Sequence, residues 1–222
     1  SQQIMELSNK TGIAANAIAD DVYNAISAGQ KTGDAVNFVT NSTKLAKAGF
    51  AESSQTLDVL TTVLNAYGMS ADKVSTVSDM LVQTQNKGKV TVGELASSMG
   101  KIIPTANASN VSLEQLCAGY AIMTSKGIAA AETTTYMNSM LNELSKSGSA
   151  TDKLLRQKMG GSFAELMASG KSLGEILGGI QEEASKSGLA LSDMFSSSEA
   201  GKAAMSLLSN GVDGFNSSVQ DM

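Results

Sequence analysis

Regular breaks marked by glycine are the feature of this sequence that most limits how the chain can fold. Glycines suited to end a helix recur at intervals of about twenty residues along the 222-residue chain. They are Gly12, Gly29, Gly49, Gly68, Gly88, Gly127, Gly148, Gly170, Gly188 and Gly211. Asn110 lies in the one long gap, and asparagine is the other residue that tolerates the left-handed conformation common at helix ends. The pattern excludes a single long rod of helix.

The apolar residues between these breaks have helical spacing. Leu57, Leu60 and Leu64 form one stripe, and similar stripes follow in 113–123 and 136–144. Residues three and four positions apart share one face of a helix, whereas a half-buried strand would alternate with a period of two. The spacing predicts an all-α fold.

Helix starts are marked as clearly as helix ends. A hydroxyl residue followed three positions later by Glu or Gln favours a capping box, in which each side chain accepts a hydrogen bond from the other residue's backbone N–H. Four such pairs occur: Thr91 with Glu94, Ser112 with Gln115, Ser162 with Glu165 and Ser172 with Glu175. Gly68 is expected to end one helix in a left-handed conformation, and Ser70 to cap the next. We therefore predict a compact array of short helices joined by tight Gly/Ser-capped turns, mostly as antiparallel hairpins.

A change of composition divides the chain near residues 145–151, which read SKSGSAT. Beyond this point glycine and serine are denser and the apolar stripes are weaker. We expect residues 1–147 to form the firmer helical domain and residues 148–222 a looser helical extension or a second lobe. Aromatic residues make up only 4% of the chain and twelve methionines fill apolar positions, which favours a core of low rigidity.

Catalytic chemistry has few candidates in this sequence. The chain contains no histidine, and Cys117 is its single cysteine, which excludes Ser-His-Asp triads, Cys–His pairs and nearly all zinc sites. Cys117 is expected to be a small buried apolar residue. We expect no catalytic, metal-binding or cofactor-binding residues, and no cofactor.

The motifs that resemble active-site sequences have simpler structural interpretations. ASGKS at 168–172 resembles the end of a phosphate-binding loop but lacks the loop's first glycine, so a helix end followed by a helix start explains it better. Ser98 and Lys101 match an S-x-x-K motif without its companion motifs. The acidic pairs at 20–21 and 182–183 are expected on solvated helix faces, because adjacent helical residues diverge by about 100°.

Two further features predict local geometry. Gly174 and Gly178 have the spacing that permits a close helix crossing, although glycine there also weakens a short helix. Pro104, the only proline, is expected to end or bend the helix that follows Thr91.

The charge pattern disfavours a nucleic-acid surface. The net charge is −5, and Arg156 is the only arginine among 16 basic residues, which are dispersed among acids. Sequence-independent and specific nucleic-acid binding both need clustered positive charge. No apolar run approaches the roughly 20 residues of a membrane span, and no signal peptide is recognisable. The chain begins without methionine in an apparent helix, so we expect a piece of something longer.

Five segments follow one another in an order that resembles a known family. They are AISAG (25–29), KLAKAGFAES (44–53), LTTVLNAYG (60–68), KGKVTVGELASSMGKIIPTA (87–106) and TSKGIAAAETTTYMNSML (124–141). Together they resemble the conserved region of phage tail tape measure proteins of the TP901 type. The resemblance covers about residues 5–147. Beyond it, the segment MFSSSEAGKAAMSLLSNG (194–211) resembles the family more weakly. Asn138 departs from the family pattern, which has arginine or lysine near this position.

The resemblance implies a structural segment of a protein that occupies the tail tube, helps set tail length and takes part in tail assembly and DNA delivery. It implies tail tube, tail tip and tail-assembly chaperone proteins as partners, and leaves self-association open. The implied location is the interior of the virion tail, with the host cytoplasm during assembly. The alternative is a helical interaction module of a secretion or translocation apparatus, and an enzyme ranks third. The family contributes no catalytic residues.

Overall fold

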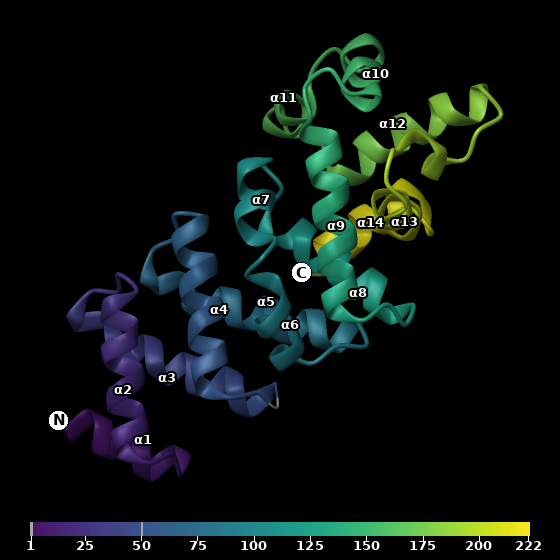
Figure 1. Cartoon of the computed structure of the whole chain (residues 1–222). Helices are drawn as coiled ribbons and strands as arrows, with labels where there is room; N and C mark the ends of the chain where they lie inside the picture. The colour runs from purple at the N-terminus through teal and green to yellow at the C-terminus, as the bar shows by residue number, and fades with distance from the viewer. Residues whose placement is uncertain (1, 50) are drawn as a thin grey trace. The chain divides into compact units, whose positions relative to one another are not determined.

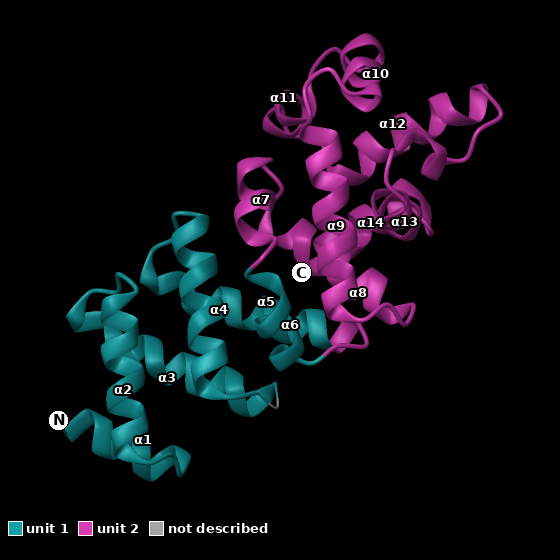
Figure 2. Ribbon diagram, in the orientation of Figure 1, with its two compact units in different colours: residues 1–85, 91–100 teal, residues 86–90, 101–222 magenta. Residues whose placement is uncertain are grey.

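The computed structural model describes residues 2–49 and 51–222, and its regular structure within these ranges is entirely helical (Figure 1). Ser1 and Phe50 lie outside the described residues, so nothing is concluded about the part of the 44–53 segment that Phe50 occupies. The all-α prediction is confirmed. The chain divides into two compact units, residues 1–85 with 91–100 and residues 86–90 with 101–222 (Figure 2).

Unit 1 is built around α4, which packs against α2, α3 and α6. Its helices are α1 (Gln2–Thr11), α2 (Ala15–Ser27), α3 (Thr32–Ala48), α4 (Ser53–Ala66), the short 3₁₀ helix η1 (Ala71–Lys73), α5 (Val74–Lys87, whose last two residues belong to unit 2) and α6 (Val92–Met99). The stripe predicted along α4 is buried, since Leu57, Leu60 and Leu64 are each at most 5% exposed. Aliphatic side chains at helical spacing therefore hold this unit together.

Unit 2 is built around α9, which packs against α7, α8, α10, α11 and α13. Its helices are α7 (Ile103–Ala108), α8 (Leu113–Ser125), α9 (Ala130–Ser145), α10 (Ala150–Lys158), α11 (Phe163–Ala168), α12 (Leu173–Lys186), the 3₁₀ helix η2 (Leu191–Met194), α13 (Ser198–Leu207) and α14 (Gly211–Gln220). Pro104 lies in the first turn of α7, after α6 has ended, as predicted. Its fixed φ and missing N–H suit a first turn and not a helix interior.

One type of corner recurs at six helix ends among the described residues. In each, a left-handed residue donates to the carbonyl three positions before it, and the next residue donates to the carbonyl five positions before itself. The left-handed residues are Gly29, Gly68, Asn110, Gly127, Gly170 and Gly188. This is the Schellman arrangement, which satisfies carbonyls that the helix end leaves unpaired. An extended N-cap residue follows two positions later, so a complete corner needs only three residues.

Gly49 ends its helix for a different reason. Its φ is −101°, which any residue adopts, but a Cβ added to it would lie 2.3 Å from Cβ of Val92. Glycine is therefore needed here for the close packing of α3 on α6, both in unit 1.

The predicted caps are confirmed in part. The boxes at Thr91–Glu94, Ser162–Glu165 and Ser172–Glu175 are reciprocal. Ser112 accepts from the backbone of Gln115, but the Gln115 side chain does not return the bond. It instead accepts the N–H of Leu173 at 2.6 Å and so connects α8 to the start of α12.

The cap predicted at Ser70 is also different in detail. Its hydroxyl bonds to the carboxylate of Asp72 and makes no cap with a backbone N–H, and a 3₁₀ turn precedes α5. The left-handed conformation predicted for Gly68 is confirmed, with φ of +61°.

The close helix crossing predicted at Gly174 and Gly178 is present between α12 and α14. A Cβ added to Gly174 would lie 2.7 Å from the Phe215 ring, and one added to Gly178 would lie 2.5 Å from Val212. Glycine on one helix thus makes room for large side chains on the other.

The domain boundary predicted after residue 147 falls inside unit 2. Side chains beyond it, including Phe163, Leu177 and Phe215, are fully buried in that unit. The division into two units therefore does not coincide with the predicted boundary. That residues 148–222 form a looser extension stays a prediction.

Candidate functional site

The residues of the apparent catalytic motifs are placed as structural groups. Cys117 is buried in α8 and is not part of a disulfide. Ser98 is buried in α6 whereas Lys101 is exposed beyond its end, and ASGKS is one of the six corners. Within residues 2–49 and 51–222, no group of three or more His, Cys, Asp or Glu side chains is placed to hold a metal ion.

Asp21 differs from the solvated carboxylate that the sequence predicted. Asp20 is exposed, but Asp21 is only 7% exposed and accepts a hydrogen bond from the Ser53 hydroxyl at 2.8 Å. Burial raises the pKa of Asp21, and the bond from Ser53 offsets part of this effect. This burial could not be predicted from the sequence, because it depends on the packing of α4 against α2.

A buried hydroxyl chain continues from this carboxylate into the core of unit 1. The backbone carbonyl of Ser53 accepts from Ser42 at 3.1 Å and from Thr56 at 2.9 Å, and the two hydroxyls lie 2.8 Å apart. Ser42 and Thr56 are almost completely buried. The interface of α2, α3 and α4 therefore contains a polar seam where a more apolar protein would have aliphatic side chains.

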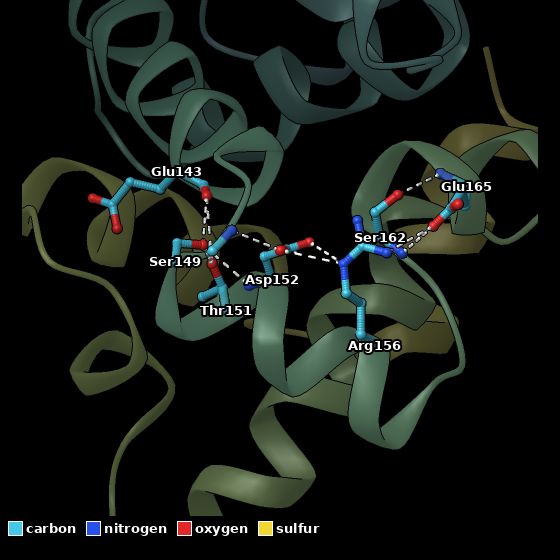
Figure 3. Close-up of polar contacts among 8 residues, drawn as sticks. Glu143, Ser149, Thr151, Asp152, Arg156, Ser162 and Glu165 are labelled. Atoms are coloured by element: carbon cyan, nitrogen blue, oxygen red, sulfur yellow. Dashed lines mark hydrogen bonds and ion pairs between the residues drawn. The ribbon is translucent and has the colours of Figure 1, made fainter.

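The chain's only arginine organises a polar cluster in unit 2 (Figure 3). The Nε of Arg156 lies 3.1 Å from the carboxylate of Asp152, and one terminal nitrogen lies 3.5 Å from that of Glu165. Asp152 also accepts the N–H of Gly148 at 2.8 Å, and Glu165 accepts the N–H of Ser162 at 2.6 Å. Arg156 thus bridges two carboxylates that already cap helix starts.

These contacts lower the pKa of both carboxylates. For Asp152 the largest cause is the N–H of Gly148, and for Glu165 it is the N–H of Ser162. The positive charge of Arg156 adds to both effects. We call this arrangement the Arg156 clasp. Its role is structural, since each of its charged groups binds a backbone N–H group or a neighbouring charged side chain.

Glu143 connects this cluster to the start of α13. Its main-chain oxygen accepts from the hydroxyls of Ser149 and Thr151, at 3.4 Å each (Figure 3). Its carboxylate accepts the N–H groups of Ser196 and Ser197, at 2.8 Å each. Burial is the largest single influence on the pKa of Glu143 and raises it, but the hydrogen bonds from Ser196 and Ser197 together outweigh burial, so the pKa is lowered.

A groove of about 810 Å³ opens beside this contact, between α9 and the η2–α13 segment. We call it the Lys202 groove and define it by its lining residues. They are Ile128, Tyr136, Ser192, Asp193, Phe195, Ser196, Ser197, Ser198, Gly201, Lys202, Met205 and Ser206. The Lys202 ammonium lies 5.2 Å from the centroid of the Tyr136 ring, a cation–π distance. Sequence reasoning missed this groove because its walls come from segments far apart in the chain.

None of the helices in the described parts of the chain has the length and apolar character needed to cross a bilayer.

An all-helical chain whose polar groups serve mainly to cap and clasp helices fits a structural protein, and comparison with known proteins defines which kind. The family described as phage-related minor tail protein matches residues 1–208, and the chain belongs to this family. A probable tape measure protein of Clostridium phage phiCD119 is 40% identical over 230 residues. That alignment includes 99% of this chain and 24% of the relative, so the chain spans about a quarter of the relative's length. No solved structure matches.

Proposed function

We propose that this chain is a folded module of a phage tail tape measure protein and that most of the length measurement is made by other parts of that protein. The match to a probable tape measure protein over nearly the whole chain supports the first half of the proposal. The family membership also favours this function over the secretion-apparatus alternative.

The recurrent corners are the observation that carries the second half. A continuous helix of this length would extend about 330 Å at 1.5 Å per residue. The longest helix within residues 2–49 and 51–222 is α3, whose 17 residues correspond to about 25 Å. Consecutive helices then pack on one another, as α2 with α3, α3 with α4, and α8 with α9. A residue in this module therefore adds much less distance than a residue in a continuous helix.

The partners that follow from this function are proposals too. A folded module needs surfaces for the tail tube, the tail tip or the tail-assembly chaperones, with which it would meet first in the host cytoplasm and then in the virion. No catalytic step is proposed for it.

Deletion of the whole module from the parent gene tests this proposal. We expect assembly or infectivity to fail, or tails to shorten by far less than the roughly 330 Å that a continuous helix would account for. Tail lengths measured by electron microscopy decide the result. Intact, infective tails shortened by about 330 Å would show that the segment is a ruler and would overturn the proposal.

A further inference from the structure

We propose that a polar cavity in unit 1 binds a small neutral ligand with adjacent hydroxyl groups, such as a single sugar ring or another polyol. The cavity has a volume of about 450 Å³ and lies between two corners of the same type, those of Gly29 and Gly68. We call it the Gln30 cavity. Its lining consists of residues 29–31, three residues in the first two turns of α3, Asn65 of α4 and residues 69–72. The inference does not depend on the proposed function.

The side chain of Gln30 is the observation that carries the proposal. Gln30 is only 9% exposed, and it lines the cavity. Within residues 2–49 and 51–222, its side-chain amide has no hydrogen-bond partner. The polar atoms that are both unpartnered and sealed from solvent belong to other residues, so the amide of Gln30 reaches the cavity. A buried amide without a protein partner lowers stability unless a ligand or water bonds to it.

The position of Gln30 in its corner makes this amide unusual. Gln30 follows the left-handed Gly29, and the residue at this position of a Schellman corner commonly makes an apolar contact with the preceding helix. The equivalent residue is apolar in four of the other five corners, namely Met69, Val111, Ile128 and Leu189. The corner therefore does not need an amide, whereas an amide that faces a cavity can bind a ligand.

Hydrogen bonds hold the walls of the cavity in place. The side-chain amide of Asn65 donates to the carbonyl of Ala28 at 2.9 Å and so joins the end of α4 to the corner between α2 and α3. At the second corner, the hydroxyl of Ser70 bonds to the carboxylate of Asp72. A site that is already formed loses less free energy to ordering when a ligand binds.

The groups around the cavity match a neutral polar ligand. Lys31 is positive, and Asp34 and Asp72 are negative, so an ion of either sign would meet a like charge at the cavity. An apolar ligand would leave the amide of Gln30 without a partner. A hydroxyl group donates and accepts through one oxygen, so adjacent hydroxyls can satisfy amides and carboxylates together. The volume lies toward the low end of the roughly 300–1,000 Å³ typical of ligand sites, which suits one small molecule.

Methyl glycosides test binding to the intact 222-residue chain. The neutral probes are the methyl glycosides of glucose, galactose, mannose and N-acetylglucosamine, together with myo-inositol. Glucuronate and glucosamine are the anionic and cationic counterparts, and N-acetylglycine N-methylamide is a peptide probe. ¹H–¹⁵N NMR follows the side-chain NH₂ signal of Gln30, which is assigned by its absence from Gln30→Met. We expect at least one neutral hydroxylated probe to shift this signal saturably, and both charged probes to bind about tenfold more weakly.

Gln30→Met is the variant that separates the cavity from the corner, because methionine keeps the length of the side chain and removes the amide. It should abolish the binding and leave the urea midpoint unchanged or raised, since no hydrogen bond is lost. Gln115→Met is the matched control in unit 2, where the amide oxygen accepts the N–H of Leu173 at 2.6 Å. This control should lower the urea midpoint and leave the binding unchanged.

Three results would overturn the proposal. One is the absence of a saturable shift of the Gln30 signal with every neutral hydroxylated probe. Another is tighter binding of a charged probe or of the peptide probe than of all the neutral hydroxylated probes. The third is a urea midpoint that Gln30→Met lowers as much as Gln115→Met does, which would show that the Gln30 amide has a partner within the protein. None of these results involves tail length, so the inference can fail while the proposed function holds.

Discussion

At the scale of single residues, glycine has two separate roles in this chain. Gly68 has a positive φ, and a Cβ there would meet nothing within 4 Å, so its need is conformational. Gly174 lies inside α12, where a Cβ would overlap the Phe215 ring, so its need is space. Sequence reasoning assigned Gly68 correctly from the adjacent cap signals. For Gly174 only the spacing to Gly178 was available, and the large partners on α14 were not foreseen.

If glycine is needed at residue 68 for its backbone conformation, the stability of a variant should depend on how well the new residue tolerates the left-handed region and not on the size of its side chain. Gly68→Ala should lower the free energy of unfolding by about 1 kcal/mol, because an L residue is strained in the left-handed region. Gly68→Asn should lower the free energy of unfolding by less than half as much, since Asn110 occupies the equivalent left-handed position in another corner of the same type. Urea unfolding measures both. Equal losses for Ala and Asn would argue against a conformational cause.

If glycine is needed at residue 174 for space, even the small side chain of alanine should destabilise the protein. Gly174→Ala should destabilise the protein by about 1–2 kcal/mol, because overpacking outweighs the gain in helix propensity. Gly33→Ala in α3 is the control, since a Cβ there would meet nothing within 4 Å and φ is not positive. We expect Gly33→Ala to be neutral or slightly stabilising. A Gly174→Ala variant as stable as Gly33→Ala would show that α12 and α14 do not pack this closely.

Burial of Asp21 predicts a pH dependence of definite sign. Its pKa is raised in the folded protein, so the ionised carboxylate opposes folding at neutral pH and the penalty disappears as pH falls through the raised pKa toward 3.8. The stability of the wild type should therefore rise relative to Asp21→Asn as pH falls. Denaturation of both proteins between pH 7 and pH 4 measures the difference.

At the scale of elements, the ends of helices were predictable and their tertiary partners were not. The hydrogen bonds of a helix cap join residues within five positions of each other, so one residue type, such as asparagine at position 110, is enough to predict a helix end. The bond from Leu173 to Gln115 and the bonds from the 196–197 segment to Glu143 join residues more than fifty positions apart. Their partners are set by how α8, α9, α12 and α13 pack, which local sequence does not encode.

Glu143 is the clearest case of such a long-range cap. Glu143→Gln should lower the free energy of unfolding by about 1–2 kcal/mol, because two charge-assisted bonds to backbone N–H groups are weakened. Its pKa is lowered in the folded state, so this contribution is present above about pH 4.5 and lost as pH falls through the folded value. The gap between wild type and variant should therefore close in acid. Glu182→Gln, which removes one exposed ion pair, should cost much less at neutral pH.

At the scale of the whole molecule, the chain consists of short helices in two compact units, and three-residue corners connect helices within each unit. The fold class followed from the helical spacing of the apolar residues between the glycines. The division into units did not follow from the sequence, because α5 and α6 lie where the sequence shows no change of composition. A polar seam in unit 1 and the clasp around Arg156 in unit 2 hold helices that carry few aromatic residues. These contacts support the folded module that we propose.

Tandem duplication of the module tests this account most directly, because the original copy stays available for assembly. The parent phage would carry residues 1–222 twice in frame, and tail lengths would be measured by electron microscopy. A control phage would carry an inserted continuous helix of the same 222 residues in length. We predict that the control lengthens the tail by about 330 Å and that the duplication lengthens it by a small fraction of this. Equal lengthening by the two insertions would contradict the account.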